Sequence, residues 1–322
     1  MKNKTLTRIA VSSLITACLM VQPCYAAEAT AETQTTEESD HHPEPAPDET
    51  ATVQEGQGTL SPPSESEGGS VFGSSASSET AGTDEKLQSV LSSLALPSGN
   101  GTWSVYVCDL EKNTEGAIQD ARMQAASLIK LYIMGAVYEN YDSIVGQYGQ
   151  SSVDSNLNSM ITVSDNDAAN TLVSYLGGGD SSAGMNVVNN FCSDKGYSST
   201  HMGRLLLASN QYDDNYTSVS DCGHFLKEVY DGNQQSDAHA QAEFALLAAQ
   251  CRRTKIPAQM PSGVSVANKT GELSDVENDA GIIYNDLNDL IIVFMSENVP
   301  QPGAAQSTIA SLSRQIYDSY NS

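Results

Sequence analysis

Basic side chains are scarce in this sequence. Its 322 residues include 15 Lys and Arg against 40 Asp and Glu, which gives a formal net charge of −25. So acidic a surface repels a polyanion over most of its area, which argues against nucleic acid as a partner. The acidity is uneven, because residues 27–83 hold 12 acidic side chains and no Lys or Arg.

Long apolar runs are also scarce. The one run near the start, Ile9–Val21, follows three basic residues and is too short for a comfortable membrane span. We therefore predict a signal peptide over residues 1–26, cleaved after Ala26, and export of the chain. The alternative is lipidation of Cys18 and tethering to the cell envelope.

Several familiar chemical motifs are missing. The sequence has no G-x-S-x-G elbow, no H-E-x-x-H helix and no phosphate-binding glycine-rich loop. Beyond the signal it has four cysteines, Cys108, Cys192, Cys222 and Cys251, and no two have C-x-x-C spacing. We therefore expect no metal and no cofactor. Two alternatives remain open for the four cysteines. They form two disulfides, in one of three possible pairings, or they are buried free thiols.

The chain divides by composition. Residues 27–84 are rich in Glu, Ser, Thr, Pro and Gly, which predicts a disordered acidic linker. Residues 85–322 read as helix, two strands, many helices, three strands and a final helix. This order predicts an α+β fold in one domain. An antiparallel sheet from both chain ends is flanked by helices, with a helical insertion between.

The first candidate for chemistry is Ser127-Leu128-Ile129-Lys130. A serine and a lysine three residues apart lie on one helix face, so a neutral lysine amine can activate the hydroxyl. The apolar neighbours Leu128 and Ile129 indicate a buried helix, in which burial lowers the pKa of a lysine. The alternative is a surface serine beside a solvated lysine.

Two further motifs follow in the chain. Ser164-Asp165-Asn166 precedes a helical pattern, and its residue types suit a helix N-cap as well as a rigidly held hydroxyl and amide. Lys269-Thr270-Gly271 follows a strand pattern that ends at Asn268. It is either a strand-ending turn or a cationic edge that binds a substrate carboxylate.

In this order, the three motifs resemble those of the class A serine β-lactamases and penicillin-binding proteins. The predicted fold agrees, and the resemblance covers essentially all of residues 85–322. It implies that Ser127 is the acylated nucleophile, that Lys130 accepts its proton, and that Ser164 relays a proton to the leaving nitrogen. Asn166 would orient Lys130 and the substrate amide.

The resemblance also assigns the strand after the insertion. Lys269, Thr270 and Gly271 would bind the substrate, the first two by holding its carboxylate. The backbone N–H groups of Ser127 and Glu272 would form an oxyanion hole.

One departure concerns turnover. Class A enzymes use a loop of form R-x-E-x-x-L-N, whose glutamate activates the deacylating water. The best match is Arg204 to Asn210, in which Leu206 takes the place of the glutamate. An apolar side chain accepts no proton, so this route of deacylation is expected to be lost. Asp213 and Asp214 are nearby acidic substitutes.

Three functions follow from these observations. The first is an exported serine hydrolase of β-lactamase type, expected to be monomeric and acting on β-lactams or related acyl amides. The second is a penicillin-binding-like peptidase, esterase or slow-deacylating sensor acting on cell-wall peptide. The third is a non-catalytic binding domain.

Overall fold

A computed structural model describes residues 84–99 and 101–321 of the chain. The predicted signal peptide and residues 27–83 of the predicted linker lie outside the described residues. Asp84 is the N-cap of the first helix, where its side chain accepts hydrogen bonds from the backbone N–H groups of Lys86 and Leu87. In the part of the chain that the structure describes, no helix has the length and apolar character needed to cross a membrane.

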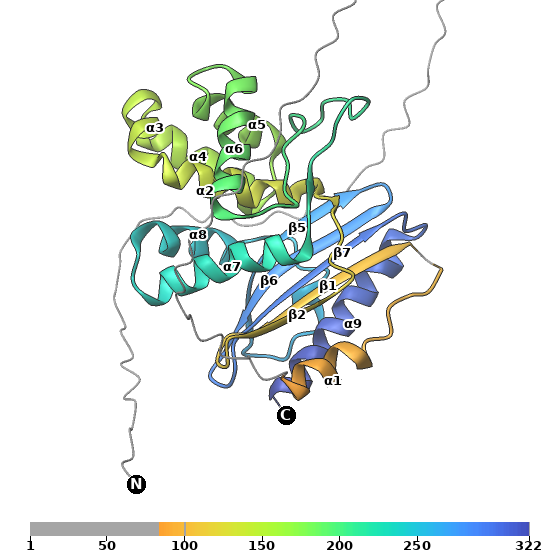
Figure 1. Cartoon of the computed structure of the whole chain (residues 1–322). Coiled ribbons are helices and arrows are strands. Elements are labelled where there is room, and N and C mark those ends of the chain that lie inside the picture. Colours follow the sequence, from red (N-terminus) through yellow and green to blue (C-terminus); the bar gives the residue numbers. More distant parts are fainter. Residues whose placement is uncertain (1–83, 100, 322) are drawn as a thin grey trace, which may run out of the picture. The chain divides into compact units, whose positions relative to one another are not determined.

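A five-stranded antiparallel sheet lies at the centre of the fold (Figure 1). Its spatial order is β2-β1-β7-β6-β5, so strands from both ends of the domain are neighbours. The strands are β1 (Thr102–Asp109), β2 (Thr114–Ile118), β5 (Ser265–Leu273), β6 (Val276–Tyr284) and β7 (Leu290–Glu297). A separate two-stranded pair consists of β3 (Met123–Gln124) and β4 (Tyr216–Thr217). The predicted α+β class, with a sheet built from both chain ends, is confirmed.

Two helices cover one face of the sheet, α1 (Glu85–Ser93) and α9 (Pro302–Asn321) (Figure 1). Their apolar side chains recur at helical spacing, and the strands supply alternate residues to the same core. Residues such as Leu87, Ile309, Val105 and Phe294 meet there and are buried.

The predicted helical insertion lies on the other face (Figure 1). Its helices are α2 (Ile129–Glu139), α3 (Tyr141–Tyr148), α4 (Gln150–Thr162), α5 (Asn166–Leu176), α6 (Ser181–Lys195), α7 (Val219–Gln234) and α8 (Ala238–Ala248). Helix α2 is buried on all sides from Ile129 to Tyr138, because it packs among its neighbours as well as against the sheet. At Gly135 an added Cβ would approach Phe191 and Phe225 within 2.8 Å, so only glycine fits this helix contact.

Two local predictions need correction. Lys269-Thr270-Gly271 lies inside β5 rather than in a turn, because the strand continues to Leu273 and pairs with β6 throughout. Helices α3 and α4 were not predicted, although apolar residues recur at helical spacing in them, such as Val153, Leu157 and Met160 in α4. The cysteine question is partly answered, because Cys108, Cys192 and Cys222 are buried free thiols. The four cysteines therefore do not form two disulfides among themselves.

Candidate active site

Ser127 lies in a short 3-10 turn, η1 (Ala126–Leu128), that leads directly into α2. The preceding residue, Ala126, has a φ of 47°, a left-handed conformation that an alanine rarely adopts. Strand β5 packs closely on this turn: a Cβ added at Gly271 would lie 2.8 Å from the backbone oxygen of Ala125. The strained turn at Ala126 and the missing side chain at Gly271 thus bring the Ser127 turn and β5 close together.

Lys130 is fully buried in the first turn of α2, one helical turn from Ser127. Its Nζ donates to the backbone oxygen of Ser164 at 2.5 Å and to Asn166 Oδ1 at 2.8 Å, and lies 3.2 Å from Ser164 Oγ. Burial lowers the pKa of Lys130 to about 7; Asp165 opposes this shift, and Arg252 adds to it. The amine is therefore available as a base near neutral pH.

Ser164 lies in the loop between α4 and α5, with a φ of 64°. The next residue, Asp165, is the N-cap of α5, and its carboxylate accepts a hydrogen bond from the Ala168 N–H at 2.7 Å. The capping role proposed for this motif is thus taken by Asp165. The cap fixes the loop, so that Ser164 Oγ lies 2.8 Å from Lys269 Nζ and 3.2 Å from Lys130 Nζ.

Lys269 approaches the same hydroxyl from β5. It is fully buried, and its Nζ also donates to the backbone oxygen of Thr270 at 2.8 Å. Burial and the nearby Lys130 and Arg252 lower the pKa of Lys269 well below its usual value. The three motifs predicted from sequence therefore meet around the hydroxyl of Ser164.

A charged cluster at the end of β5 was not found from the sequence. Lys255 is fully buried, and its Nζ lies 3.1 Å from Glu272 Oε1 and 2.6 Å from Glu277 Oε2. Glu272 and Glu277 face each other across β5 and β6, where two carboxylates alone would repel. Lys255 compensates them, and it also donates to the backbone oxygen of Gly271 at 3.3 Å. The signal available was the basic segment Arg252-Arg253-Thr254-Lys255, which nothing in the sequence connects with Glu272 and Glu277.

The loop that carries Leu206 is held firmly against α5. Asn170 accepts from the Leu206 N–H at 2.9 Å and donates to its carbonyl oxygen at 3.1 Å. The Leu206 side chain is buried in the main core. Arg204 and Asp214 close the loop with an ion pair of 2.6 Å between Nε and Oδ1. Asp214 is therefore a structural partner of Arg204, while Asp213 binds His201 at 2.7 Å.

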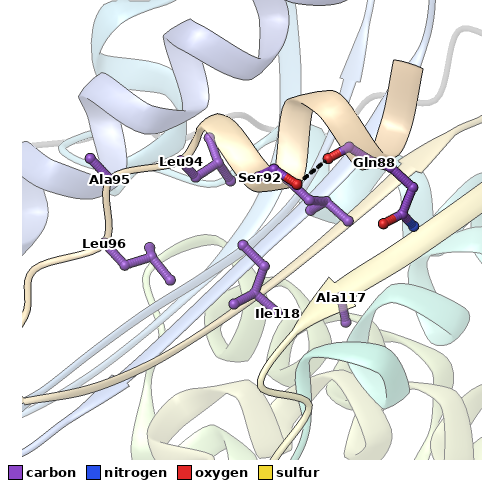
Figure 2. Close-up of a pocket in the computed structure, with 8 residues that line it drawn as sticks. Gln88, Ser92, Leu94, Ala95, Leu96, Ala117 and Ile118 are labelled. Atoms are coloured by element: carbon purple, nitrogen blue, oxygen red, sulfur yellow. Dashed lines mark hydrogen bonds between the residues drawn. The ribbon is translucent and has the colours of Figure 1, made fainter. Parts of the chain in front are cut away.

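Two other features of the described residues are separate from this site. In residues 84–99 and 101–321, no three His, Cys, Asp or Glu side chains are grouped to hold a metal ion. A hollow of about 560 Å³ lies between α1 and β2, where Leu94 and Ile118 line it (Figure 2). Strand β2 is at the opposite edge of the sheet from β5, so this hollow is separate from the Ser127 region.

Comparison with known families agrees with this arrangement. The model of a family described as the β-lactamase enzyme family matches residues 83–145 and 146–320. The chain belongs to this family. A search of curated proteins finds no match.

Solved structures of this family and its relatives share the fold. A β-lactamase from Sphaerobacter thermophilus DSM 20745 has 20% identity and a TM-score of 0.62, covering 73% of this chain and 97% of that chain. The structure of PBP-A has 20% identity and a TM-score of 0.63, covering 74% of this chain and 96% of that chain. A leucine-to-glutamate mutant of PBP-A is described as an acyl-enzyme complex with penicillin G. It has 20% identity and a TM-score of 0.61, and the match covers 73% of this chain and 96% of that chain.

Proposed function

We propose that the protein is an exported serine hydrolase that is acylated on Ser127 by β-lactams or related acyl amides. The observation that carries the proposal is the contact of Lys130 and Lys269 with one hydroxyl, Ser164 Oγ. Lys130 itself lies one helical turn from Ser127. Family membership supports the serine hydrolase chemistry. Export rests on the basic start of the sequence and the apolar run Ile9–Val21.

The hydrogen bonds of Lys130 define its role. A neutral amine has two N–H donors and one lone pair. Donation to the backbone oxygen of Ser164 and to Asn166 Oδ1 uses both donors, which leaves the lone pair for a hydroxyl proton, that of Ser164 at 3.2 Å or that of Ser127. Among the described residues, the Ser127 hydroxyl makes no hydrogen bond, either with Lys130 or with another group, so the proton transfer requires Ser127 Oγ to approach Lys130 Nζ in the substrate complex.

Acylation then proceeds in two steps. Lys130 takes the proton from Ser127 Oγ as this oxygen bonds to the substrate carbonyl carbon, and the N–H groups of Ser127 and Glu272 receive the oxyanion. The C–N bond breaks as Ser164 gives its proton to the leaving nitrogen, and Lys130 returns its extra proton to Ser164. The Lys130 amine and the Ser164 hydroxyl are then restored, and Ser127 carries the acyl group as an ester.

The pH dependence of acylation follows from the lowered pKa of Lys130. The base is active when neutral, and its pKa is about 7, so the neutral fraction increases as the pH rises through 7. We expect the acylation rate to increase about tenfold from pH 6 to pH 8, and then to level off, because the protonated fraction becomes small. Stopped-flow acylation by a chromogenic β-lactam across this range measures it. A rate that is flat between pH 6 and pH 8 would contradict a neutral Lys130 base.

The proposal is tested by a time course of intact mass after the purified protein is mixed with benzylpenicillin. An adduct of one penicillin mass on Ser127, found by peptide mapping, is the expected result. An adduct on another residue, or none, would refute the proposal.

The lifetime of that adduct separates two versions of the function. The buried, apolar Leu206 favours a long-lived acyl-enzyme, as expected of a penicillin-binding peptidase or a sensor. An adduct that decays together with the appearance of hydrolysed drug instead indicates a β-lactamase.

A further inference from the structure

Glu272 lies on β5 beside the residues that are expected to bind a substrate carboxylate, Lys269 and Thr270. Glu272 directly follows Lys269-Thr270-Gly271 on β5, and its side chain is 27% exposed. It pairs with Arg252, with 2.5 Å between Oε2 and Nη1, and with the buried Lys255. Glu272 and Lys269 are close enough for each to shift the pKa of the other.

Arg252 lies at the same end of the site. The preceding residue, Cys251, donates its N–H to the backbone oxygen of Thr162 at 2.8 Å, two residues before Ser164. The guanidinium charge of Arg252 contributes to the lowered pKa of both Lys130 and Lys269. A cation in this position would attract a substrate carboxylate if its charge were not already compensated.

The charges in this region compensate one another. Arg252 and Lys255 supply two positive charges, and Glu272 and Glu277 supply two negative charges. Burial would raise the pKa of the Glu272 carboxyl, but Lys255 and Arg252 hold it below its usual value, so it is anionic at neutral pH. Lys269 is the remaining cation, and its burial opposes its positive charge. The site therefore has little positive charge to spare for an anionic group.

We propose that Glu272 sets the charge specificity of the site, disfavouring acyl donors with a carboxylate beside the scissile bond and favouring donors that are neutral there. This inference rests on the proposed acylation of Ser127. A substrate carboxylate at Lys269 and Thr270 must approach Glu272 or displace it from Arg252, and either event costs electrostatic energy. A neutral ester or amide at the same place avoids this cost.

The test uses two acyl donors that differ only in this charge, benzylpenicillin and its methyl ester. In the unaltered protein, we expect the methyl ester to form the Ser127 adduct at least as fast as the acid. In Glu272→Gln, the ratio of the acid rate to the ester rate should rise about tenfold, because one like charge is removed at short range. The glutamine has one acceptor oxygen, so it keeps a contact with either Arg252 or Lys255, and Lys255 keeps its pair with Glu277.

Asp275→Asn is the matched control. Asp275 is an exposed carboxylate in the turn between β5 and β6, and its side chain contacts Ser274. Removal of this charge should leave the rate ratio within about twofold of the unaltered protein, because exposed charges at a distance are screened. Thermal melts of both variants check that they fold.

The outcomes separate this inference from the proposed function. A clear preference of the unaltered protein for the acid would overturn the inference, as would an equal change of the ratio in Glu272→Gln and Asp275→Asn. In both cases adducts still form, and the proposed function stands. If neither donor forms an adduct with the unaltered protein, the proposed function is refuted and the specificity inference with it.

Discussion

Ser127→Ala is expected to abolish covalent labelling by benzylpenicillin, with acylation at least about 10⁴-fold slower than in the unaltered protein. The hydroxyl forms the bond to the acyl group, and alanine has no nucleophilic atom to replace it. Ser127 is partly exposed in the η1 turn, so removal of one oxygen should not disturb packing. Intact mass after incubation with the drug measures the loss, and circular dichroism should be unchanged.

Ser155→Ala is the control for this variant. Ser155 is an exposed serine in α4, so its replacement should leave labelling as fast as before. Labelling that persists in Ser127→Ala would show that another residue is the nucleophile. The Lys130–Ser164–Lys269 contacts would then need a different interpretation.

Leu206→Glu should speed release of the acyl group by about 10²–10⁴-fold, the usual contribution of a general base. The backbone of Leu206 is fixed by two hydrogen bonds with Asn170, so the Cα of a glutamate at this position should keep its place in the loop. The Arg204–Asp214 ion pair also closes the loop independently of residue 206. Decay of the intact-mass adduct, together with appearance of hydrolysed drug, measures the rate.

Leu207→Glu provides a close comparison. Its side chain is 76% exposed, so a carboxylate one residue along the chain points into solvent. We expect no acceleration in this variant. If Leu206→Glu folds, as judged by circular dichroism and by unimpaired acylation, and still releases the acyl group no faster than Leu207→Glu, then position 206 does not face a deacylating water.

Much of this site could be predicted from short segments of sequence. Ser127 and Lys130 are three residues apart, and Ser164 and Asn166 are two apart, so helix and loop geometry places each pair without knowledge of the fold. The order of strand and helix patterns was also enough to predict a sheet built from both chain ends. Helices α3 and α4 were missed although their apolar residues recur at helical spacing, as Val153, Leu157 and Met160 do in α4, because polar residues fill the positions between them.

The charges around β5 could not be predicted in this way. Lys255 is separated from Glu272 and Glu277 by strand residues, and only the antiparallel register brings both carboxylates to one lysine. Lys269-Thr270-Gly271 was equally ambiguous, because Lys and Gly are uncommon in strand interiors. Pairing with β6 overrides this local preference, so the motif becomes part of the sheet.

The antiparallel pairing of β1 with β7 has a consequence for biogenesis. It joins Thr102 to Glu297, so the central part of the sheet closes only when nearly the whole domain is present. Closing so long a loop costs conformational entropy before any contact compensates it, which slows folding. The β5 strand, with Lys269, comes after the entire insertion. A nascent chain therefore already carries Ser127 but lacks β5 and Lys269 until synthesis is almost complete.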